Sequence, residues 1–260
     1  MIEIRGVHKE FVKGERRVLA LQDIDLTVAQ HEFVAILGPS GCGKSTLLNM
    51  VAGFDRPTRG SVQVEGEQIV EPSPRRCVVF QEPALFPWLT VMDNVVFGPK
   101  NRRQPAAEYR PRAAQIIEQV GLRGFEASYP AELSGGMRQR VGIARVLIME
   151  PKVLLMDEPF GSLDAQTRTL MQELLLSLWE RQHQTVLFVT HDIEEAILLA
   201  DRVCVMTARP GRIKKSIGVR IPRPRSIELT TSAEFNALRR EVLDLIREES
   251  LRAAMERAGA

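Results

Sequence analysis

The sequence has few of the features that mark secreted, membrane-spanning or metal-stapled proteins. It contains 3 cysteines in 260 residues, an odd number without paired spacing, so neither a disulfide framework nor a zinc site is predicted. No apolar run approaches the roughly 18 residues that cross a bilayer. The N-terminus has neither an apolar segment nor a small-residue cleavage site of the secretory kind. We therefore expect a cytoplasmic protein that does not cross a membrane by itself.

A large excess of either charge is also absent. The 35 Lys and Arg nearly balance the 33 Asp and Glu, which leaves a formal net charge of +2. A protein that neutralises a long run of phosphates normally carries a clear basic excess, so the composition does not support a dedicated nucleic-acid binder. With 44% apolar and 26% charged residues, the composition is that of a folded globular protein and excludes the disordered and fibrous classes.

Short apolar segments alternate with longer helical patterns along most of the chain. This alternation predicts an α/β fold with a largely parallel central sheet. The predicted buried strands are residues 33–37, 78–80, 153–157, 186–190 and 203–206. A long helix is predicted at 165–182, where a wide apolar stripe that includes Leu170 and Leu174 should pack on the sheet.

Three regions depart from this alternation. The apolar segments at 27–28 and 61–64, with glycine turns between strands, predict a small antiparallel sheet in the first 65 residues. Between 83 and 150 strand signals fade and helical patterns predict an inserted helical subdomain. After a linker rich in proline and arginine at 221–225, an apolar stripe predicts a final helix.

Residues 38–45 (Gly-Pro-Ser-Gly-Cys-Gly-Lys-Ser) match the pattern of a phosphate-binding loop. A predicted strand precedes the loop and a helical segment follows it, which is the context such loops require. The glycines let backbone N–H groups converge on phosphate oxygens, Lys44 supplies a cation and Ser45 can ligate Mg²⁺. The alternative is a strand-to-helix turn without a ligand, but the context favours ATP or GTP binding. The residues of this predicted site are Gly38, Pro39, Ser40, Gly41, Cys42, Gly43, Lys44, Ser45 and Thr46.

Residues 153–158 (Val-Leu-Leu-Met-Asp-Glu) form an apolar strand that ends in two carboxylates. Carboxylates at the end of a buried strand are costly unless a metal or a water needs them. Asp157 is predicted to hold Mg²⁺ through water, and Glu158 to orient or deprotonate the water that attacks a γ-phosphate. Taken alone, such a pair is more often a turn or a helix cap. The phosphate loop upstream favours the catalytic interpretation.

Residues 133–140 (Leu-Ser-Gly-Gly-Met-Arg-Gln-Arg) resemble the signature motif of the ATP-binding subunits of ABC transporters. By itself, Ser-Gly-Gly before a helix is a good N-cap and little more. In the family this motif contacts the γ-phosphate held by the opposite subunit. The resemblance therefore implies that Ser134, Gly135 and Gly136 complete the site of a neighbouring chain. Met137 departs from the glutamine that is usual at its position.

Four further residues match family positions. By this resemblance Gln81 touches Mg²⁺ and the attacking water, His191 is the switch histidine that contacts the γ-phosphate, and Asp164 belongs to the loop that crosses the dimer interface. Phe11 lies where the family places an aromatic under the adenine ring. Taken singly, these residues would be a loop amide, a packed or capping histidine, a helix cap and a core aromatic.

The resemblance covers almost the whole chain and implies a fold. That fold is the P-loop NTPase, an α/β protein whose RecA-like parallel sheet core carries an N-terminal antiparallel β subdomain and an inserted α-helical subdomain. We expect the ABC ATPase domain over 1–225, with core and β subdomain at 1–83 and 151–225 and the helical subdomain at 84–150. A C-terminal helical extension is expected over 226–260.

The same resemblance implies an activity and partners. One chain carries one phosphate loop and one signature, so two copies should pack head to tail around ATP and Mg²⁺ before hydrolysis can occur. The segment 221–225, the final helix and the signature resemble the ATPases of nitrate, sulfonate and taurine importers. This implies the ATP-hydrolysing, energy-coupling subunit of an importer for a small anion, bound peripherally to the cytoplasmic face of the inner membrane. Its partners would be transmembrane permease subunits and, through them, a periplasmic or lipid-anchored solute-binding protein.

Other functions remain as alternatives. An importer of another small metabolite, such as a pyrimidine precursor, would have an ATPase of the same kind. A soluble ABC protein that acts on nucleic acid or ribosomes is disfavoured by the near-zero net charge and the absence of long coiled-coil segments. A phosphate-loop kinase would have no use for the signature motif or for His191.

Two surface features have open interpretations. Phe86 and Trp88 follow Gln81 closely, and each is predicted either to contact a coupling helix of a membrane subunit or to pack in the core. Seven basic residues and no acidic residue occur between Arg209 and Arg225. This basic segment is predicted to be a solvated face, with a membrane-facing surface as the alternative.

Overall fold

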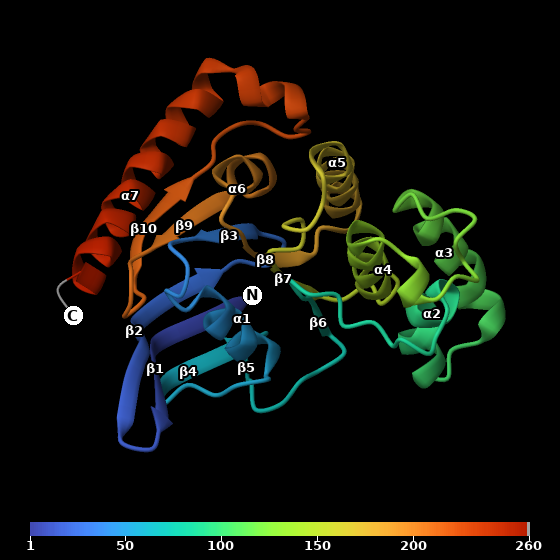
Figure 1. The fold of residues 1–260 in the computed structure, drawn as a ribbon, viewed down its shortest axis with the longest axis horizontal. Coiled ribbons are helices and arrows are strands. Elements are labelled where there is room, and N and C mark those ends of the chain that lie inside the picture. Colours follow the sequence, from blue (N-terminus) through green and yellow to red (C-terminus); the bar gives the residue numbers. More distant parts are fainter. Residues whose placement is uncertain (259–260) are drawn as a thin grey trace. The chain divides into compact units, whose positions relative to one another are not determined.

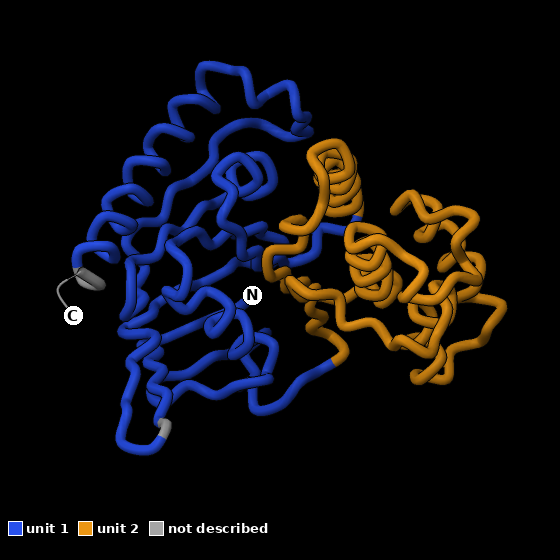
Figure 2. Tube along the Cα trace, in the orientation of Figure 1, with its two compact units in different colours: residues 1–73, 182–260 blue, residues 74–181 orange. Residues whose placement is uncertain are grey.

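A computed structural model describes residues 1–258 of the chain; residues 259–260 of the predicted C-terminal extension lie outside the described residues. The chain divides into two compact units, which Figure 2 shows in blue and orange. The first unit comprises Met1–Ser73 and Gln182–Ala260, and the second comprises Pro74–Arg181. The second unit contains the whole of the expected helical subdomain at 84–150, together with two strands and a helix that the sequence assigned to the core.

An antiparallel sheet occupies the N-terminal part of the first unit (Figure 1). Its strands lie in the order β2-β1-β4-β5. They are β1 (Ile2–Lys13), β2 (Arg16–Val28), β4 (Arg59–Val64) and β5 (Glu67–Gln68). Alternate residues of β2 are buried as the strand nears Val28, which is the pattern of a sheet with one face against the core. The predicted antiparallel sheet is confirmed, although its first two strands are much longer than the sequence suggested.

A second sheet in the first unit positions the phosphate-binding loop. Its strands here are β3 (Phe33–Leu37), β8 (Thr185–Val189), β9 (Arg202–Met206) and β10 (Ile213–Gly218). β3 lies between β8 and β9 and is parallel to both, whereas β10 is antiparallel to β9. All five residues of β3 and of β8 are buried, as expected for parallel strands that are covered on both faces.

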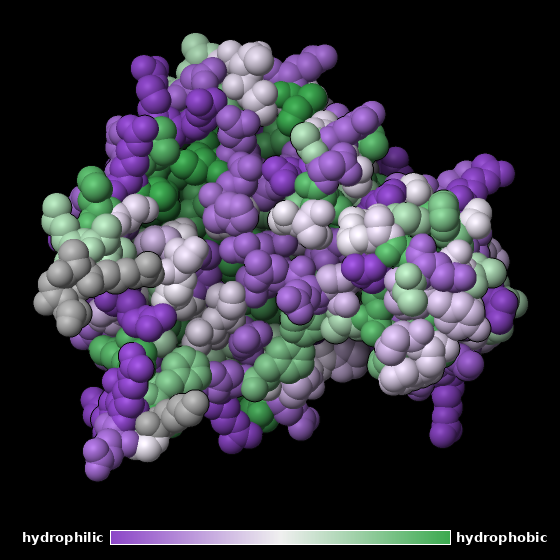
Figure 3. Space-filling model, viewed as in Figure 1, coloured by the Kyte–Doolittle hydropathy of each residue, from purple (hydrophilic) through white to green (hydrophobic). Residues whose placement is uncertain are grey.

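Helices cover this sheet on both faces. α1 (Lys44–Ala52) contacts β8 and β4 and so packs between the two sheets of the unit. α6 (Ile193–Leu199) packs on β3 and β9, and α7 (Ala233–Ala258) packs on α6 and β9 (Figure 1). The short 3₁₀ helix η2 (Ile227–Thr231) precedes α7. Charged side chains project from the outer edge of α7, where Figure 3 shows hydrophilic residues beside hydrophobic ones.

The linker between β10 and α7 is fixed by one buried arginine. Arg225 is only 7% exposed, and its guanidinium donates hydrogen bonds to carbonyl oxygens of two segments. Three of these oxygens, on Ile197, Leu198 and Ala200, belong to the C-terminal end of α6. An arginine at this end of a helix satisfies carbonyls that have no partner within the helix.

The second unit combines one strand pair with a group of helices. β6 (Arg76–Val79) and β7 (Val153–Asp157) are parallel, with Val79 opposite Met156. The helices are α2 (Val91–Asn101), α3 (Ala106–Gln119), α4 (Gly135–Leu147), α5 (Ala165–Gln182) and the 3₁₀ helix η1 (Pro130–Glu132). Asn94, 1% exposed, holds the loop before α2 because its amide donates to the carbonyl oxygens of Phe86, Leu89 and Thr90.

The five predicted buried strands and the helix predicted at 165–182 agree with the structure to within two residues, but the packing of α5 differs from the prediction. Leu170 is 58% exposed, so the expectation that it lies on the buried stripe of this helix is wrong. The buried face is narrower and consists of Met171, Gln172, Leu175, Leu176 and Trp179. Leu170 lies outside this face, and Leu174, the other residue named for the predicted stripe, is half-buried at its margin.

Candidate functional site

The phosphate-binding loop connects buried strand β3 to helix α1. Gly43 is the N-cap residue of α1 and has a φ of 104°, a left-handed conformation that favours glycine. A Cβ on Gly43 would lie 2.5 Å from Leu21 Cδ2, so close packing also excludes a side chain. The first turn of α1, which lies within the described residues, contains no acidic residue. The positive end of the helix is therefore available to an anion.

Lys44 lies folded against its own loop. It is 7% exposed, and its ammonium donates to Gly38 O at 2.8 Å and to Pro39 O at 3.2 Å. Ser45, the next residue, is exposed. The loop thus holds a cation and a hydroxyl at the start of a helix, which is the arrangement that the sequence predicts for binding a polyphosphate.

His191 leaves the sheet beside the phosphate-binding loop. β8 pairs with β3 in parallel up to Val189, and Thr190 N donates to Ile36 O at 3.2 Å. Because the carboxyl ends of parallel strands meet at one edge of a sheet, His191 and the phosphate-binding loop emerge at the same edge of the first unit. The imidazole of His191 is exposed.

A buried hydroxyl–carboxylate pair shapes the turn that carries His191. Thr190 Oγ1 donates to Glu195 Oε2 at 2.7 Å and accepts from Asp192 N at 3.0 Å. Asp192 is the N-cap of α6 and accepts from Glu194 N and Glu195 N. These bonds fix the backbone on both sides of His191, so its exposed side chain extends from a defined turn.

In the second unit, Gln81 contacts one of the predicted catalytic carboxylates. The side-chain amide of Gln81 donates to Glu158 Oε2 at 3.2 Å. β6 and β7 end side by side, which places Gln81, Asp157 and Glu158 at one edge of this strand pair. Glu158 has a φ of 45°, an uncommon conformation for a residue with a side chain. Such strain is concentrated at functional sites.

The signature residues start helix α4. Ser134 is the N-cap, and its hydroxyl accepts from Met137 N at 3.2 Å. Ser134 and Gly135 are exposed. A Cβ on Gly136 would lie 3.3 Å from Leu163 Cδ2, so this glycine packs against the predicted interface loop. The alternative function of Ser134, as a helix cap, is therefore present whether or not the residue also meets a phosphate.

A buried glutamine links the signature helix to the strand before Gln81. Gln139, 1% exposed, donates from Nε2 to Phe80 O at 3.0 Å. Phe80 directly precedes Gln81 in the chain. The signature helix and the residue that contacts Glu158 are thus connected within one unit.

Asp164 and Phe11 are both at the surface. Asp164 accepts from Thr167 N at 2.9 Å at the start of α5, and this backbone hydrogen bond is the main cause of a lowered pKa for its carboxyl. Phe11 is 45% exposed, with Lys9 Nζ 5.0 Å from the centre of its ring. The alternative that Phe11 belongs to the core is therefore wrong, and its ring is accessible.

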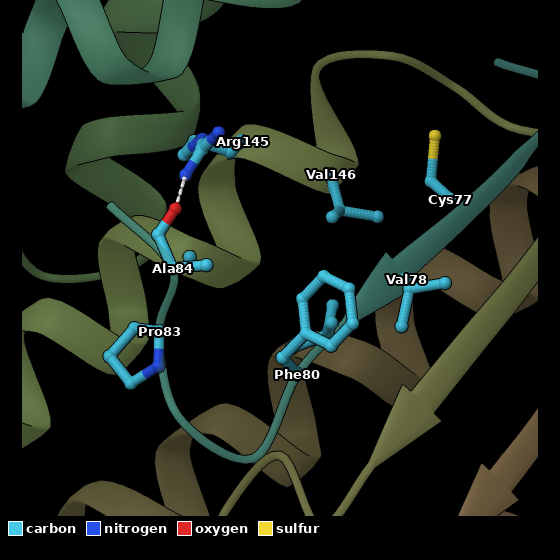
Figure 4. Close-up of a pocket in the computed structure, with 9 residues that line it drawn as sticks. Cys77, Val78, Phe80, Pro83, Ala84, Arg145 and Val146 are labelled. Carbon is cyan, nitrogen blue, oxygen red and sulfur yellow. Dashed lines mark hydrogen bonds between the residues drawn. The ribbon is translucent and has the colours of Figure 1, made fainter. Parts of the chain in front are cut away.

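A cavity of about 220 Å³ lies between β6, the loop after it and α4. Figure 4 shows Arg145 and Ala84 at one side of it and Cys77 and Val78 at the other. Arg145 donates to Ala84 O, and its guanidinium carbon lies 4.8 Å from the centre of the Phe86 ring. Burial raises the pKa of the Cys77 thiol to about 11, so this group is an uncharged part of the lining.

The two aromatics near Gln81 have different environments. The Phe86 ring packs against Phe97 with 4.3 Å between ring centres. Trp88 is 71% exposed. Phe86 is thus half-buried against Phe97, whereas Trp88, whose ring centre lies 5.7 Å from that of Phe86, presents a large apolar surface to solvent.

The basic segment 209–225 is not an unpaired basic face. Five of its seven basic residues have acceptors in the first unit. Arg209 donates to Gly41 O, Lys214 to Glu248 and Glu249, Lys215 to Glu241, Arg223 to Asp201 and Leu199 O, and Arg225 to backbone carbonyls. Arg209, Arg212, Lys215 and Arg220 are exposed, as predicted for a solvated face, whereas Lys214, Arg223 and Arg225 are partly or fully buried and hold segments of the first unit together.

One contact of the phosphate-binding loop was missed from the sequence. Arg209 lies in the turn between β9 and β10, and its guanidinium donates to Gly41 O from Nε at 3.2 Å and from Nη2 at 2.9 Å. Only its membership of the basic segment set it apart in the sequence.

Across residues 1–258, no helix combines the length and the apolar character that a membrane span requires.

Comparison with known proteins agrees with these features. Residues 21–161 match the family described as ABC transporter. An uncharacterized ABC transporter ATP-binding protein of Methanocaldococcus jannaschii is 46% identical over 252 residues, which are 97% of this chain and 93% of that protein. The aliphatic sulfonates import ATP-binding protein SsuB of Bacillus cereus is 47% identical over 93% of this chain and 94% of its own length.

Two solved structures of an ATP-binding cassette, MJ0796, have the same fold. One is described as the dimeric structure of a bacterial ABC transporter cassette; it is 34% identical and has a TM-score of 0.78 over 85% of this chain and 100% of its own. The other is a dimeric post-hydrolysis state bound to ADP and Pi, with 32% identity and a TM-score of 0.77 over the same shares. The predicted P-loop NTPase fold is thereby confirmed.

Proposed function

Because the chain belongs to the ABC transporter family and is an ATPase of that family, we propose that it powers an importer for a small anion. An aliphatic sulfonate is the proposed solute, with taurine or nitrate as related anions. The observation that carries this proposal is the 46–47% identity to aliphatic sulfonate import proteins of Bacillus species over 93% of the chain. The solute itself is selected by other subunits, so the residues of this chain act on ATP.

The proposed ATP site uses the phosphate-binding loop. Backbone N–H groups of the loop and the positive end of α1 bind the β- and γ-phosphates, and Lys44 turns from the loop carbonyls to the outer phosphates. The accessible ring of Phe11 stacks on adenine. Glu158 orients or deprotonates the attacking water, Gln81 contacts that water, and His191 contacts the γ-phosphate.

Mg²⁺ fits the donor chemistry of this site. Among the side chains that the structure describes, no group of three or more His, Cys, Asp or Glu could hold a metal ion. Mg²⁺ usually keeps several waters and is bound by one or two carboxylates together with substrate phosphates. The ligands we propose are oxygen donors from Ser45, Gln81 and Asp157, the last through water. When bound, Mg²⁺ would neutralise charge on the phosphates.

We further propose that hydrolysis requires a head-to-tail homodimer. Ser134 and Gly135 are exposed at the N-terminus of the 13-residue helix α4, where backbone N–H groups and the helix dipole favour an anion. Together with Gly136 they complete the partner's ATP site, and Asp164 lies in the loop that crosses between the chains. The dimeric state of the related cassette supports this assembly.

Permease subunits are the proposed membrane partners. The cavity between β6 and α4 has an apolar lining with one arginine, and Trp88 is exposed a few residues beyond it in the chain. An apolar side chain from a permease helix fits this cavity, with Trp88 beside it. This partner would keep the chain on the cytoplasmic face of the inner membrane and link it to a periplasmic or lipid-anchored solute-binding protein. No nucleic-acid partner is proposed.

Purification of the tagged chain from native membranes in mild detergent tests this proposal. We expect a multi-span permease to co-purify, and the ATPase rate of the complex to rise when an aliphatic sulfonate is added with the binding protein. Taurine, nitrate and a pyrimidine precursor are assayed in parallel. Activation by the pyrimidine precursor alone would replace the proposed solute, and recovery of ribosomal proteins without a permease would overturn the transport function.

Matched variants test the docking surface. Trp88→Ala should reduce recovery of the permease, because it removes a large exposed apolar side chain. Phe125→Ala removes another exposed aromatic of the same unit, 41% exposed, and should leave recovery unchanged. Equal recovery with both variants would show that Trp88 is not part of the interface.

A further inference from the structure

The turn between β9 and β10, residues 208–211, packs against the backbone of the phosphate-binding loop. Gly211 N donates to Ala20 O at 2.9 Å, and Gln22 N donates to Gly211 O at 3.0 Å, which ties the turn to β2. A Cβ on Gly211 would lie 2.1 Å from Cys42 O. The backbones of the turn and of the loop are therefore in direct contact, with no room for a side chain between them.

Arg209 fixes the orientation of one peptide in the phosphate-binding loop. Its two hydrogen bonds end on the carbonyl oxygen of Gly41, whose φ is 76°. Glycine adopts many backbone conformations at little cost, so a loop that contains several glycines gains from an external restraint. Because the peptide group is planar, holding Gly41 O also fixes the direction of the N–H of Cys42. That N–H points across the loop toward Pro39 O, 3.3 Å away.

Arg209 also adds positive charge to the loop. Burial raises the pKa of the Cys42 thiol, while the charges of Lys44 and Arg209 act in the opposite direction. The positive charge of the Arg209 guanidinium thus contributes to the electrostatic potential within the loop. A positive potential there favours a bound polyphosphate.

The C-terminal helix holds this turn through one buried carboxylate. Glu249 on α7 is 0% exposed, and it accepts from Ala208 N at 2.9 Å and from Lys214 Nζ at 2.6 Å. Ala208 directly precedes Arg209. Phe235, Val242 and Glu249 are spaced seven residues apart on α7, and all three are buried. The Glu249 carboxylate therefore lies on the same buried face of the helix as the two apolar side chains.

We infer that Arg209 is a positioning residue for ATP binding at the phosphate-binding loop, and that Glu249 of α7 keeps it in place through the turn at 208–211. Arg209 acts on the loop peptide and not on the reacting atoms. The C-terminal helix is thereby connected to the proposed ATP site by two contacts, Glu249 to Ala208 and Arg209 to Gly41, which the turn joins. This inference rests on the proposed ATP site, but not on the transported solute.

ATP binding and steady-state hydrolysis by the full chain test the inference. Dissociation constants for a fluorescent ATP analogue are measured in the Glu158→Gln background, and KM and kcat in the otherwise native chain. Arg209→Ala should raise the dissociation constant and KM about five-fold, the equivalent of one hydrogen bond, with kcat changed less than about two-fold. Arg209→Lys keeps the charge and should recover part of the loss. Arg209 is exposed, so these variants should fold.

A double-mutant cycle tests the link to α7. Glu249→Gln should weaken ATP binding about two- to five-fold, and combining it with Arg209→Ala should give no further loss, because both act through the same contact. Glu241→Gln is the control. It removes the 2.9 Å pair with Lys215, which joins the same two elements without touching the turn, and should leave ATP binding unchanged.

Distinct results would overturn the inference. An unchanged KM in Arg209→Ala, or equal losses in Arg209→Ala and Arg209→Lys, would show that the arginine does not position the loop by its charge and hydrogen bonds. Additive losses in the cycle would exclude a role for Glu249 through Arg209. Lys44→Ala is measured alongside: if it too leaves ATP binding unchanged, the proposed ATP site itself is wrong. Should Glu249→Gln fail to fold, the Arg209 variants decide the first part alone.

Discussion

Gln81 donates a hydrogen bond from its side-chain amide to Oε2 of Glu158, with 3.2 Å between the two atoms. The residues are 77 positions apart in the chain and meet because β6 and β7 are parallel and end together. One is proposed to contact the attacking water and the other to accept its proton. Gln81 is therefore one of the groups that orient the Glu158 carboxylate.

Replacing Glu158 with Gln should stop turnover without loss of ATP binding. The amide keeps the shape of the side chain and cannot accept the proton, so kcat should fall about a thousandfold. Stable dimers should accumulate in Mg-ATP, which size-exclusion chromatography with light scattering measures. A variant that hydrolyses ATP normally, or that stays monomeric in saturating Mg-ATP, would contradict both the catalytic and the dimer proposals.

Two substitutions of Gln81 should differ in a defined order. Gln81→Ala removes the hydrogen bond to Glu158 and should lower kcat about tenfold, while Gln81→Glu should be slower still, because two carboxylates within hydrogen-bond distance repel. Initial-rate measurements at saturating Mg-ATP give the order. If Gln81→Glu were the faster of the two, the contact with Glu158 would have no part in hydrolysis.

Arg225 should matter for stability more than for catalysis. Arg225→Ala leaves several buried carbonyl oxygens without their donor, which should cost about 3 kcal/mol and lower the melting temperature by roughly 6–12 °C. Arg225→Lys should fall between Arg225→Ala and the native chain. Arg220→Ala, an exposed arginine of the same segment, is the control and should melt as the native chain does in thermal unfolding followed by circular dichroism.

The stability that Glu249 contributes should disappear at acidic pH. Burial alone would raise the pKa of Glu249, but the hydrogen bonds from Lys214 and Ala208 outweigh it, so the pKa lies below its ordinary value of 4.5. A carboxyl group whose pKa is lowered by folding contributes its full stabilisation of the folded state above its ordinary, unfolded-state pKa. This contribution is lost as the pH falls through the lower pKa of the folded state. Glu249→Gln should therefore melt well below the native chain at pH 7, and the gap should narrow below pH 4.5.

Glu248→Gln provides the comparison for that titration. Glu248 also pairs with Lys214, at 2.7 Å, but its side chain is 61% exposed. Its removal should shift the melting temperature little at any pH, since exposed pairs contribute little. A gap for Glu249→Gln that stays constant down to pH 3 would mean that its charge is not what stabilises the helix.

The phosphate-binding loop and its flanking elements were predictable from the sequence because the determinants are local. A five-residue apolar run gives β3, the glycines give the turn, and Lys44 begins a helix with an apolar face. The same holds for β7, whose apolar residues lead directly to Asp157 and Glu158. In both places the chemistry follows from residues that are adjacent in the chain.

Contacts between distant segments were not predictable. Glu249 resembles any other acidic residue on a charged helix, and its partners lie 35 and 41 positions away. Arg209 and Arg225 were grouped together as part of one basic segment, although one contacts the phosphate-binding loop and the other the end of α6. Sequence periodicity reports which face of a helix is apolar, and not which carbonyl oxygen an arginine will reach.

Helix α2 lies within the predicted helical subdomain, but its individual bounds were not predicted from the sequence. Pro99 lies inside it, and proline normally ends or bends a helix because it removes a backbone donor. The helix continues to Asn101 because Val91, Val95 and Val96 are buried and α2 packs on α3 and α4. Packing in the second unit thus outweighs a local signal to stop.

The two hydrogen bonds of Lys44 to Gly38 O and Pro39 O have a consequence for nucleotide exchange. In the proposed ATP site, ATP would compete with these carbonyls for the ammonium, so this lysine would add to the affinity only the difference between the two sets of partners. When ADP leaves the proposed site, the ammonium would return to these carbonyls, so it would not remain buried without a hydrogen-bond partner. In the proposed ATP site, partners of this kind within the protein would weaken nucleotide binding, which would favour release of ADP after each round of hydrolysis.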